Sequence, residues 1–376
     1  MDKKNKMKFV AIRSNIKEAI TTIERAAGEN LNLPILKNVL IETTNDGIVF
    51  TATNLEIAIN CSVSGKVIEN GKITVPIGIF SNLITNLQSD RLNFAAKGNA
   101  LEIKTDNYNA TLQGLSATDF PTTPKIKNTS ESLEMKGVLL KEAIQQVVVA
   151  AQFSDLRPEL AAVLFDFSVD NVKLAATDGF RLAERSIPQS FFTAKFKDPF
   201  KILIPLKTAQ EVLRIARDDE SVRIFRDENQ VLFKTDRVEL ISRLTEGLFP
   251  DYSAIIPKKF TTEVTVHREE FANAIKLAGV FGQKTSEVKI GAYPAKKAIE
   301  VSSADQSLGE NNYLLTAKIK GGDAEAFFNW RYLADPIKAM KAEELFIGFQ
   351  EETNPALVRP MGDASYFYIL KPILKS

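Results

Sequence analysis

The chain has 376 residues, of which 44% are hydrophobic and 25% are charged, and its formal net charge is +1. These proportions are typical of a folded globular protein and exclude a disordered or fibrous chain. So small a net charge gives no overall attraction to nucleic acid, which would require lysines and arginines gathered on one surface.

The counts of cysteine and histidine exclude common metal sites. The chain contains one cysteine, Cys61, and one histidine, His267, which are too few for a zinc site built from these residues. No phosphate-binding loop of the Walker type and no Gly-x-Gly-x-x-Gly fingerprint occurs. Cys61 lies in an apolar alternation that predicts a packed, reduced thiol. We therefore expect a binding protein, not an enzyme, with no catalytic residue, metal or cofactor.

The sequence carries no membrane-spanning pattern. No apolar run approaches the ~18 residues that cross a membrane as a helix. Residues 1–6 lack the apolar core of a signal peptide. We therefore expect a cytoplasmic protein.

The first third of the chain mixes strand and helix patterns. Apolar residues at helical spacing predict one helix after Ser14, a plausible N-cap, and another opened by Val75-Pro76. The apolar face of the second helix is expected to contain Ile79, Phe80, Leu83, Ile84 and Leu87. Alternation and turn signals predict strands over residues 7–12, 38–42, 47–53, 55–63, 91–96, 100–104 and 109–115.

The same order of elements recurs twice. Helices are predicted over 138–151 and after Ile204-Pro205, then again over Phe271 to Ala278 and over 329–340. Pro336 is expected to fit only the first turn of the last helix and to shorten it. Corresponding residues keep nearly constant separations: 124 residues from Thr53 to Thr177, 129 from Phe120 to Phe249, and 127 from Thr177 to Ala304.

A period of this length is the size of a whole domain, not of a solenoid unit. The sequence therefore predicts an α+β protein of three repeated domains, each an antiparallel sheet with two helices on one face. The expected domains are 1–128, 129–257 and 258–376, with linkers at 122–130 and 257–262.

The clearest local signal is the stretch Ala176 to Leu182. Asp178-Gly179 predicts a tight turn, because glycine accepts positive φ and aspartate can accept hydrogen bonds from nearby backbone. Phe180 and Leu182 are expected to face away from Arg181. Residues 52–54 and 303–305 partly repeat this stretch, so we expect the turn to belong to the fold that the three copies share.

Several motifs in consistent order resemble a known family. These are residues 33–36 (Leu-Pro-Ile-Leu), 176–182 (Ala-Thr-Asp-Gly-Phe-Arg-Leu), 247–252 (Gly-Leu-Phe-Pro-Asp-Tyr), 354–360 and 368–373. Together they resemble the bacterial sliding clamps, the beta subunits of DNA polymerase III, and the resemblance runs from Met7 to the C-terminus. It implies a head-to-tail homodimer that closes into a ring around duplex DNA, with helices lining the hole and sheets forming the rim.

The resemblance also implies partners and a peptide site. The expected partners are duplex DNA, bound without sequence specificity, the polymerase III catalytic subunit, an ATP-driven clamp loader and repair polymerases. The family's peptide-motif pocket, between the middle and last domains, maps onto Leu160, Thr177, Gly179, Phe180, Arg181, Leu182, Pro250, Ile255, Asn329, Tyr332, Ile369, Leu370, Lys371, Pro372 and Ile373.

The same resemblance implies two further sets of residues. Cations expected to face DNA are Lys17, Arg25, Lys141, Arg157, Lys207, Arg214, Arg217, Lys276 and Lys338. The expected dimer interface contains Tyr108, Ala110, Val280 and Phe281.

The chain departs from the family pattern at several positions. Phe180 replaces a frequent histidine, Ala254 an arginine, Lys371 a methionine or leucine, Asn30 a DNA-facing arginine and Ala110 an aromatic residue. Two alternatives to a clamp remain at this point. One is a carboxylate-dependent hydrolase, and the other is an interaction scaffold that uses the peptide site without encircling DNA.

Overall fold

The computed structural model describes residues 6–28 and 32–374 and divides the chain into two compact units. The first unit contains residues up to 138 together with 214–244, and the second contains 139–213 and residues from 245 onward. Asn30 lies outside the described residues. Within the described ranges, no helix is long and apolar enough to span a membrane.

In the first copy of the repeat, the strands form two antiparallel sheets beside two helices. The predicted single sheet is divided because β1 pairs with β5 and β7, giving the order β5-β1-β7-β8-β9, while the other sheet runs β4-β3-β2-β6. The elements are β1 (Lys6–Ile12), α1 (Arg13–Ile23), β2 (Asn38–Thr44), β3 (Gly47–Thr53), β4 (Ile57–Val63), β5 (Gly65–Glu69), β6 (Gly71–Pro76), α2 (Ile77–Asn86), β7 (Arg91–Lys97), β8 (Ala100–Lys104) and β9 (Asn109–Gln113).

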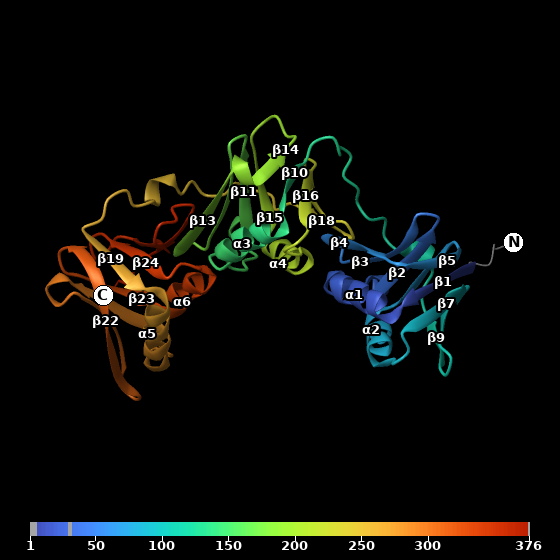
Figure 1. Ribbon diagram of the computed structural model, residues 1–376, viewed down its shortest axis with the longest axis horizontal. Coiled ribbons are helices and arrows are strands. Elements are labelled where there is room, and N and C mark those ends of the chain that lie inside the picture. Colours follow the sequence, from blue (N-terminus) through green and yellow to red (C-terminus); the bar gives the residue numbers. More distant parts are fainter. Residues whose placement is uncertain (1–5, 29–31, 375–376) are drawn as a thin grey trace. The chain divides into compact units, whose positions relative to one another are not determined.

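The two helices of this copy pack side by side through their apolar faces (Figure 1). Phe80 and Ile84 of α2 are buried as predicted, but Ile79 is 58% exposed and Ile77 is buried in its place. The helix begins directly after Pro76, and this rotates Ile77 and not Ile79 onto the buried face. The predicted cap at Ser14 is also wrong, because α1 begins at Arg13 and has no side-chain cap.

The second copy has the same order of elements. Its apolar helix residues Leu140, Ile144, Val147, Ala209 and Val212 are all buried, as predicted. The elements are β10 (Leu133–Lys136), α3 (Gly137–Val148), β11 (Ala162–Ser168), β12 (Asn171–Thr177), β13 (Arg181–Pro188), β14 (Phe192–Ala194), β15 (Phe200–Pro205), α4 (Leu206–Ile215), β16 (Ser221–Arg226), β17 (Gln230–Lys234) and β18 (Val238–Arg243).

The third copy repeats the pattern, and α5 lies beside α6 (Figure 1). Phe271, Ile275 and Ala278 of α5 are buried, as predicted. The elements are β19 (Thr262–His267), α5 (Arg268–Phe281), β20 (Glu287–Tyr293), β21 (Ala298–Asp305), β22 (Gly309–Gly321), β23 (Ala324–Asn329), α6 (Trp330–Ala339), β24 (Glu344–Phe349), β25 (Ala356–Pro360) and β26 (Tyr366–Leu370).

Pro336 does not shorten α6. The proline lies inside the helix, which has ten residues like its counterparts α2 and α4. Proline lacks the N–H that would bond to the carbonyl of Tyr332, four residues earlier. Pro336 is buried and lies close to the end of the helix, so packing compensates for one lost hydrogen bond.

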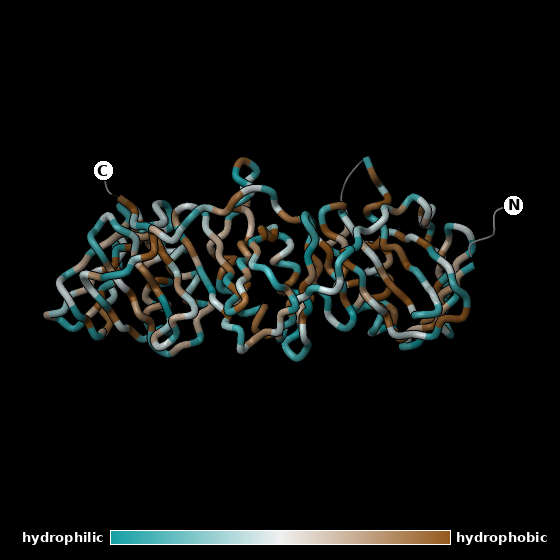
Figure 2. Tube along the Cα trace, turned by 90° about the horizontal axis from the view of Figure 1, so that it is seen from above, coloured by the Kyte–Doolittle hydropathy of each residue, from teal (hydrophilic) through white to brown (hydrophobic). Residues whose placement is uncertain are grey.

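In each unit a strand of one copy pairs with a strand of the next. In the first unit β4 pairs with β18, which places Cys61 opposite Val238. In the second unit β13 pairs with β26, which places Arg185 opposite Tyr366. In Figure 2 the hydrophobic stretches lie mostly inside the trace and the hydrophilic ones mostly at its periphery. Sheets therefore continue from one copy to the next at these joints.

A turn after the third strand of each copy is built in the same way. The side-chain Oδ1 of Asn54 accepts hydrogen bonds from the backbone of residues 56 and 57. That of Asp178 accepts from residues 180 and 181, and that of Asp305 from residues 307 and 308. The predicted turn at Asp178-Gly179 is confirmed, with Gly179 at φ +90°.

Cys61 is buried and unpaired, as predicted. Burial and the nearby Glu18 carboxylate raise the pKa of its thiol to about 11, against the opposing effect of Arg237 and Arg217. At pH 8 we expect its reaction with a thiol reagent to be about 100-fold slower than that of the unfolded chain, because the thiolate is the reactive form. Labelling rates measured with and without denaturant test this, and equal rates would contradict it.

Candidate functional site

The β13–β26 pair brings two predicted parts of the peptide site together. Arg181 lies opposite Leu370, and Leu182 lies opposite Ile369. Just beyond the paired region, the backbone N–H of Lys371 donates to the carbonyl of Phe180 at 2.9 Å. The turn of the middle copy and the C-terminal strand therefore form one continuous surface.

Arg181 is engaged on three sides. Its Nε donates to Asp178 Oδ2 at 2.8 Å, and its Nη1 donates to Asp335 Oδ2 at 3.3 Å. The guanidinium also lies 3.9 Å from the centre of the Tyr332 ring. Only 10% of the Arg181 side chain is exposed. Arg181 thus ties the turn to helix α6 and holds Tyr332 in place.

Phe180 and Leu182 have different environments. Phe180 is 62% exposed, whereas Leu182 is buried against Phe346, Leu357 and Ile369. Leu182 follows the pleat of β13, whereas Phe180 belongs to the turn before it, and the expectation that both face away from Arg181 stays a prediction. The hydroxyl of Thr177 closes the turn by donating to the Arg181 carbonyl at 2.6 Å.

Other predicted residues lie on the same unit. Asn329 caps α6, because its Oδ1 accepts from the N–H of Arg331 at 3.0 Å. The N–H of Ile373 donates to the carbonyl of Phe327 at 2.7 Å, which fixes the tail after the half-buried Pro372. Leu160 is buried, Pro250 is half-buried, and Ile255 lines a separate cleft of about 510 Å³ with Gln350 and Pro355.

The sequence did not identify the carboxylates that organise this site. Asp335 lies 154 residues from Arg181 along the chain, so no local pattern indicated their contact. Glu184, unlike the partly exposed Asp335, is buried, and it accepts a 2.6 Å hydrogen bond from the Tyr252 hydroxyl. Burial and this carboxylate raise the pKa of Tyr252 far above its ordinary value.

In the first unit, predicted cations surround Glu18. Its carboxylate accepts hydrogen bonds from Arg217 and from Arg237, the latter at 3.2 Å and 3.3 Å. Arg214 donates to the carbonyl of Thr21. These residues and Lys17 line a cleft of about 460 Å³, while Arg25 is exposed on the following 3-10 turn. Arg237 was not predicted from the sequence.

The predicted cations of the second unit are mostly exposed. Arg157 donates to Glu159 at 3.1 Å, and Lys338 lies 3.7 Å from Asp335. Lys207 lies 6.0 Å from the centre of the Phe153 ring. Lys276 is exposed on α5, and Lys141 is half-exposed on α3.

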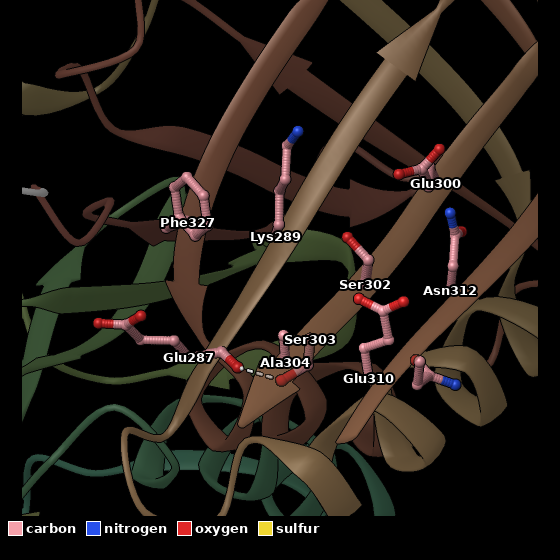
Figure 3. Close-up of a pocket in the computed structure, with 10 residues that line it drawn as sticks. Glu287, Lys289, Glu300, Ser302, Ser303, Ala304, Glu310, Asn312 and Phe327 are labelled. Atoms are coloured by element: carbon pink, nitrogen blue, oxygen red, sulfur yellow. Dashed lines mark hydrogen bonds between the residues drawn. The ribbon is translucent and has the colours of Figure 1, made fainter. Parts of the chain in front are cut away.

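The four predicted interface residues lie near two strand edges. β9 ends its sheet and carries Ala110, and Tyr108 just before it is 42% exposed. At the end of α5, Val280 is 52% exposed, and the Phe281 ring lies near Gly309 at the start of β22. Figure 3 shows the hollow beside this strand, lined by Glu310 and Asn312 of β22 among others.

The first half of β22 is an open edge. Residues 309–316 pair with β21, and pairing with β19 begins only at Ala317. Among the residues that the structure describes, the buried side-chain oxygen of Asn311 has no hydrogen-bond partner. This edge is therefore free to pair with another strand.

The chain matches three models of the DNA polymerase III beta subunit. These describe the N-terminal domain over residues 7–124, the central domain over 134–251 and the C-terminal domain over 253–373. The chain is 28% identical to the beta sliding clamp of Chlamydia pneumoniae over 373 residues, covering 98% of this chain and 99% of that protein. The DNA polymerase sliding clamp of Bacillus subtilis aligns with a TM-score of 0.92 and 27% identity, covering 98% of this chain and 100% of that one.

Proposed function

Because the chain belongs to the family of the DNA polymerase III beta subunit, the bacterial sliding clamps, we propose that it encircles duplex DNA as a head-to-tail dimer. In this role it tethers the replicative polymerase and other motif-bearing proteins through the surface around Arg181, Leu182 and Ile369. The observation that carries the proposal is that neighbouring copies are joined twice in the same way, by pairing the last strand of one copy with a hairpin strand of the next. One strand of each of these two types is left without such a partner. The proposed domains remain 1–128, 129–257 and 258–376.

The repeat specifies how the ring would close. β18 joins β4, and β26 joins β13, so each joint pairs the last strand of one copy with the hairpin strand of its neighbour. By the same correspondence, β9 is the last strand of the first copy and β22 the hairpin strand of the third. Pairing β9 with β22 of a second molecule continues the pattern at both ends and satisfies both edges.

The register of this closing pair follows from the existing joints. Cys61 opposes Val238, and Arg185 opposes Tyr366. The residues that correspond to them by position in the hairpins are Tyr313 on β22 and Tyr108 before β9. Tyr108 is therefore expected opposite Tyr313 of a second copy, and Ala110 opposite Asn311.

A pair of cysteines tests this register. In a Cys61→Ala background, Ala110→Cys with Asn311→Cys should form disulfide-linked dimers on mild oxidation, because directly opposed residues lie about 4.5–5.5 Å apart at Cα. The control is Ala110→Cys with Tyr313→Cys, which is displaced by two residues. Cross-linking that is equal in the two variants would contradict the register.

Electrostatic contact with DNA would be loose. A ring that slides along DNA must be attracted to the phosphates without reading the bases. Exposed lysines and arginines supply this attraction. Five of the six helices, all but α2, provide most of the proposed DNA-facing cations, with the others in the segments after helices. Glu18 offsets part of this charge by binding Arg217 and Arg237.

Replacing Glu18 with glutamine should strengthen DNA binding. The change frees two guanidinium groups for phosphate, so the slope of log affinity against log salt should become steeper by about 1 to 2. Fluorescence anisotropy with duplex DNA at several salt concentrations measures this. The control is Glu239→Gln, which removes a similarly exposed carboxylate from its 2.6 Å pair with Lys234 on a strand. An unchanged slope for Glu18→Gln would contradict the proposal that Glu18 keeps two guanidinium groups away from phosphate.

The proposed function has a direct test. Sedimentation should show a particle of twice the 41.7 kDa chain mass. After loading, this particle should stay on nicked circular DNA and leave linear DNA through its ends. Equal retention on both forms, or a strictly monomeric protein, would favour an interaction scaffold that does not encircle DNA.

A further inference from the structure

A second surface of the last domain has the features of a binding site. A cleft of about 1470 Å³ lies over β19, β22, β24 and β25, and none of the cations proposed to face DNA lines it. Six cationic side chains line it, against three carboxylates: Lys258, Lys259, Lys297, Lys318, Lys320 and Arg359. The whole chain has a net charge of only +1, so this cleft concentrates positive charge.

Most of these cations are not neutralised. Lys318 lies 3.2 Å from Glu344, but its side chain is 81% exposed, and such pairs contribute little. Lys258, Lys259, Lys297 and Lys320 form no ion pair with any carboxylate in the described part of the chain. The cleft therefore offers several hydrated charges to an incoming anion.

The floor of the cleft is rigid. Phe260 lies against Phe346 with ring centres 5.4 Å apart, and its ring occupies the space above Gly348, where any side chain would clash. The Arg359 guanidinium lies 4.7 Å from the centre of the Phe346 ring. Arg359 is thus held in place, and a fixed guanidinium is well suited to bind a carboxylate.

The spacing of the lysines indicates an extended ligand. Lys318 and Lys320 are two residues apart on β22, so they share a face about 6.6 Å apart. Carboxylates at alternate positions of an extended peptide have the same spacing. Across the sheet, Thr265 lies opposite both Lys318 and Phe346, and Phe346 lies opposite Arg359. Thr265 and Phe346 therefore separate the cations of β22 from Arg359.

We propose that this cleft, defined by Lys318, Lys320 and Arg359, binds an acidic, extended peptide segment of a partner protein. Single-stranded nucleic acid fits less well, because its binding sites present aromatic faces for stacking. Here Phe346 is only 7% exposed and lies beneath Arg359 and beside Phe260. Phe346 in the floor of the cleft packs against Leu182, but Arg181, Leu182 and Ile369 do not line the cleft. The proposal does not depend on ring formation.

The test uses the full-length protein and a fluorescein-labelled peptide of alternating glutamate and serine, about twelve residues long. We expect saturable binding that weakens with salt and is absent for the matching glutamine–serine peptide. Lys318→Glu with Lys320→Glu should weaken binding at least about tenfold, because two attractions become repulsions.

The matched control is Lys195→Glu with Lys197→Glu, an exposed pair that is also two residues apart in sequence and does not line the cleft. It should leave peptide binding within about twofold. Equal weakening by both pairs would overturn the proposal, because only overall charge would then matter. Failure of the peptide to bind, or tighter binding of an oligothymidylate of equal length, would also overturn it. Circular dichroism checks that both variants fold.

Discussion

Replacing Val280 with aspartate should leave the protein folded but convert the proposed dimer into monomers that are not retained on circular DNA. Val280 is 52% exposed at the end of α5 in the single chain, so a carboxylate there remains hydrated. In the proposed ring the same carboxylate would be buried in an apolar contact, and the exposed Lys276, one turn earlier on α5, would offset only a small part of the cost. Burying a charge costs several kcal/mol, so the dimer dissociation constant should rise by at least about 100-fold.

A second exposed valine serves as the control for this substitution. Val169 is 48% exposed in the hairpin between β11 and β12 and belongs to neither β9, β22 nor α5. Val169→Asp should therefore sediment as the wild type does. If Val280→Asp also remained dimeric at micromolar concentration, the ring would have to close through another surface than β9, β22 and the end of α5.

The sequence predicted the features that depend on local chemistry. The turn at Asp178-Gly179 was predicted because the aspartate accepts hydrogen bonds two and three residues ahead and the glycine takes positive φ. The repeat was predicted because equivalent strands and helices recur at a nearly constant interval. Cys61 was predicted to be packed because its neighbours alternate, and it is buried.

The errors and omissions have physical reasons. Ile79 and Ile77 are equally apolar, so composition could not decide which of them faces the core. Pro336 was assigned to a first turn because burial, which compensates for its missing hydrogen bond, is not visible in sequence. Arg237 binds Glu18 across 219 residues of sequence, so its role required the folded structure.

The role of Arg181 also depends on contacts that the sequence does not show. The resemblance assigns it to the wall of the peptide pocket, which suggests a free guanidinium that binds the ligand. The structure instead commits two of its nitrogens to Asp178 and Asp335 and places its plane near Tyr332. Its contribution to peptide binding is therefore expected to pass mainly through Tyr332.

Arg181→Ala should reduce the free energy of unfolding by about 3 kcal/mol, because it leaves the nearly buried Asp178 carboxylate without its cation. Asp335→Asn should cost under about 1 kcal/mol, since the Asp335 side chain is 36% exposed. Chemical denaturation measures both. Arg181→Ala should also weaken binding of a peptide with leucine and phenylalanine anchors by at least about tenfold, whereas Asp335→Asn keeps the guanidinium near Tyr332 and should change it little.

Arg185 provides the control on the same strand. It lies four residues beyond Arg181 and donates to Asp363 at 3.0 Å and to Ser365 at 2.6 Å. Arg185→Ala should therefore lower stability but leave peptide affinity unchanged under conditions where the protein is folded. If both alanine variants weakened the peptide equally, the loss would reflect the joint between β13 and β26 as a whole. If Arg181→Ala bound the peptide normally, Tyr332 would be held by its helix alone and Arg181 would serve only the turn.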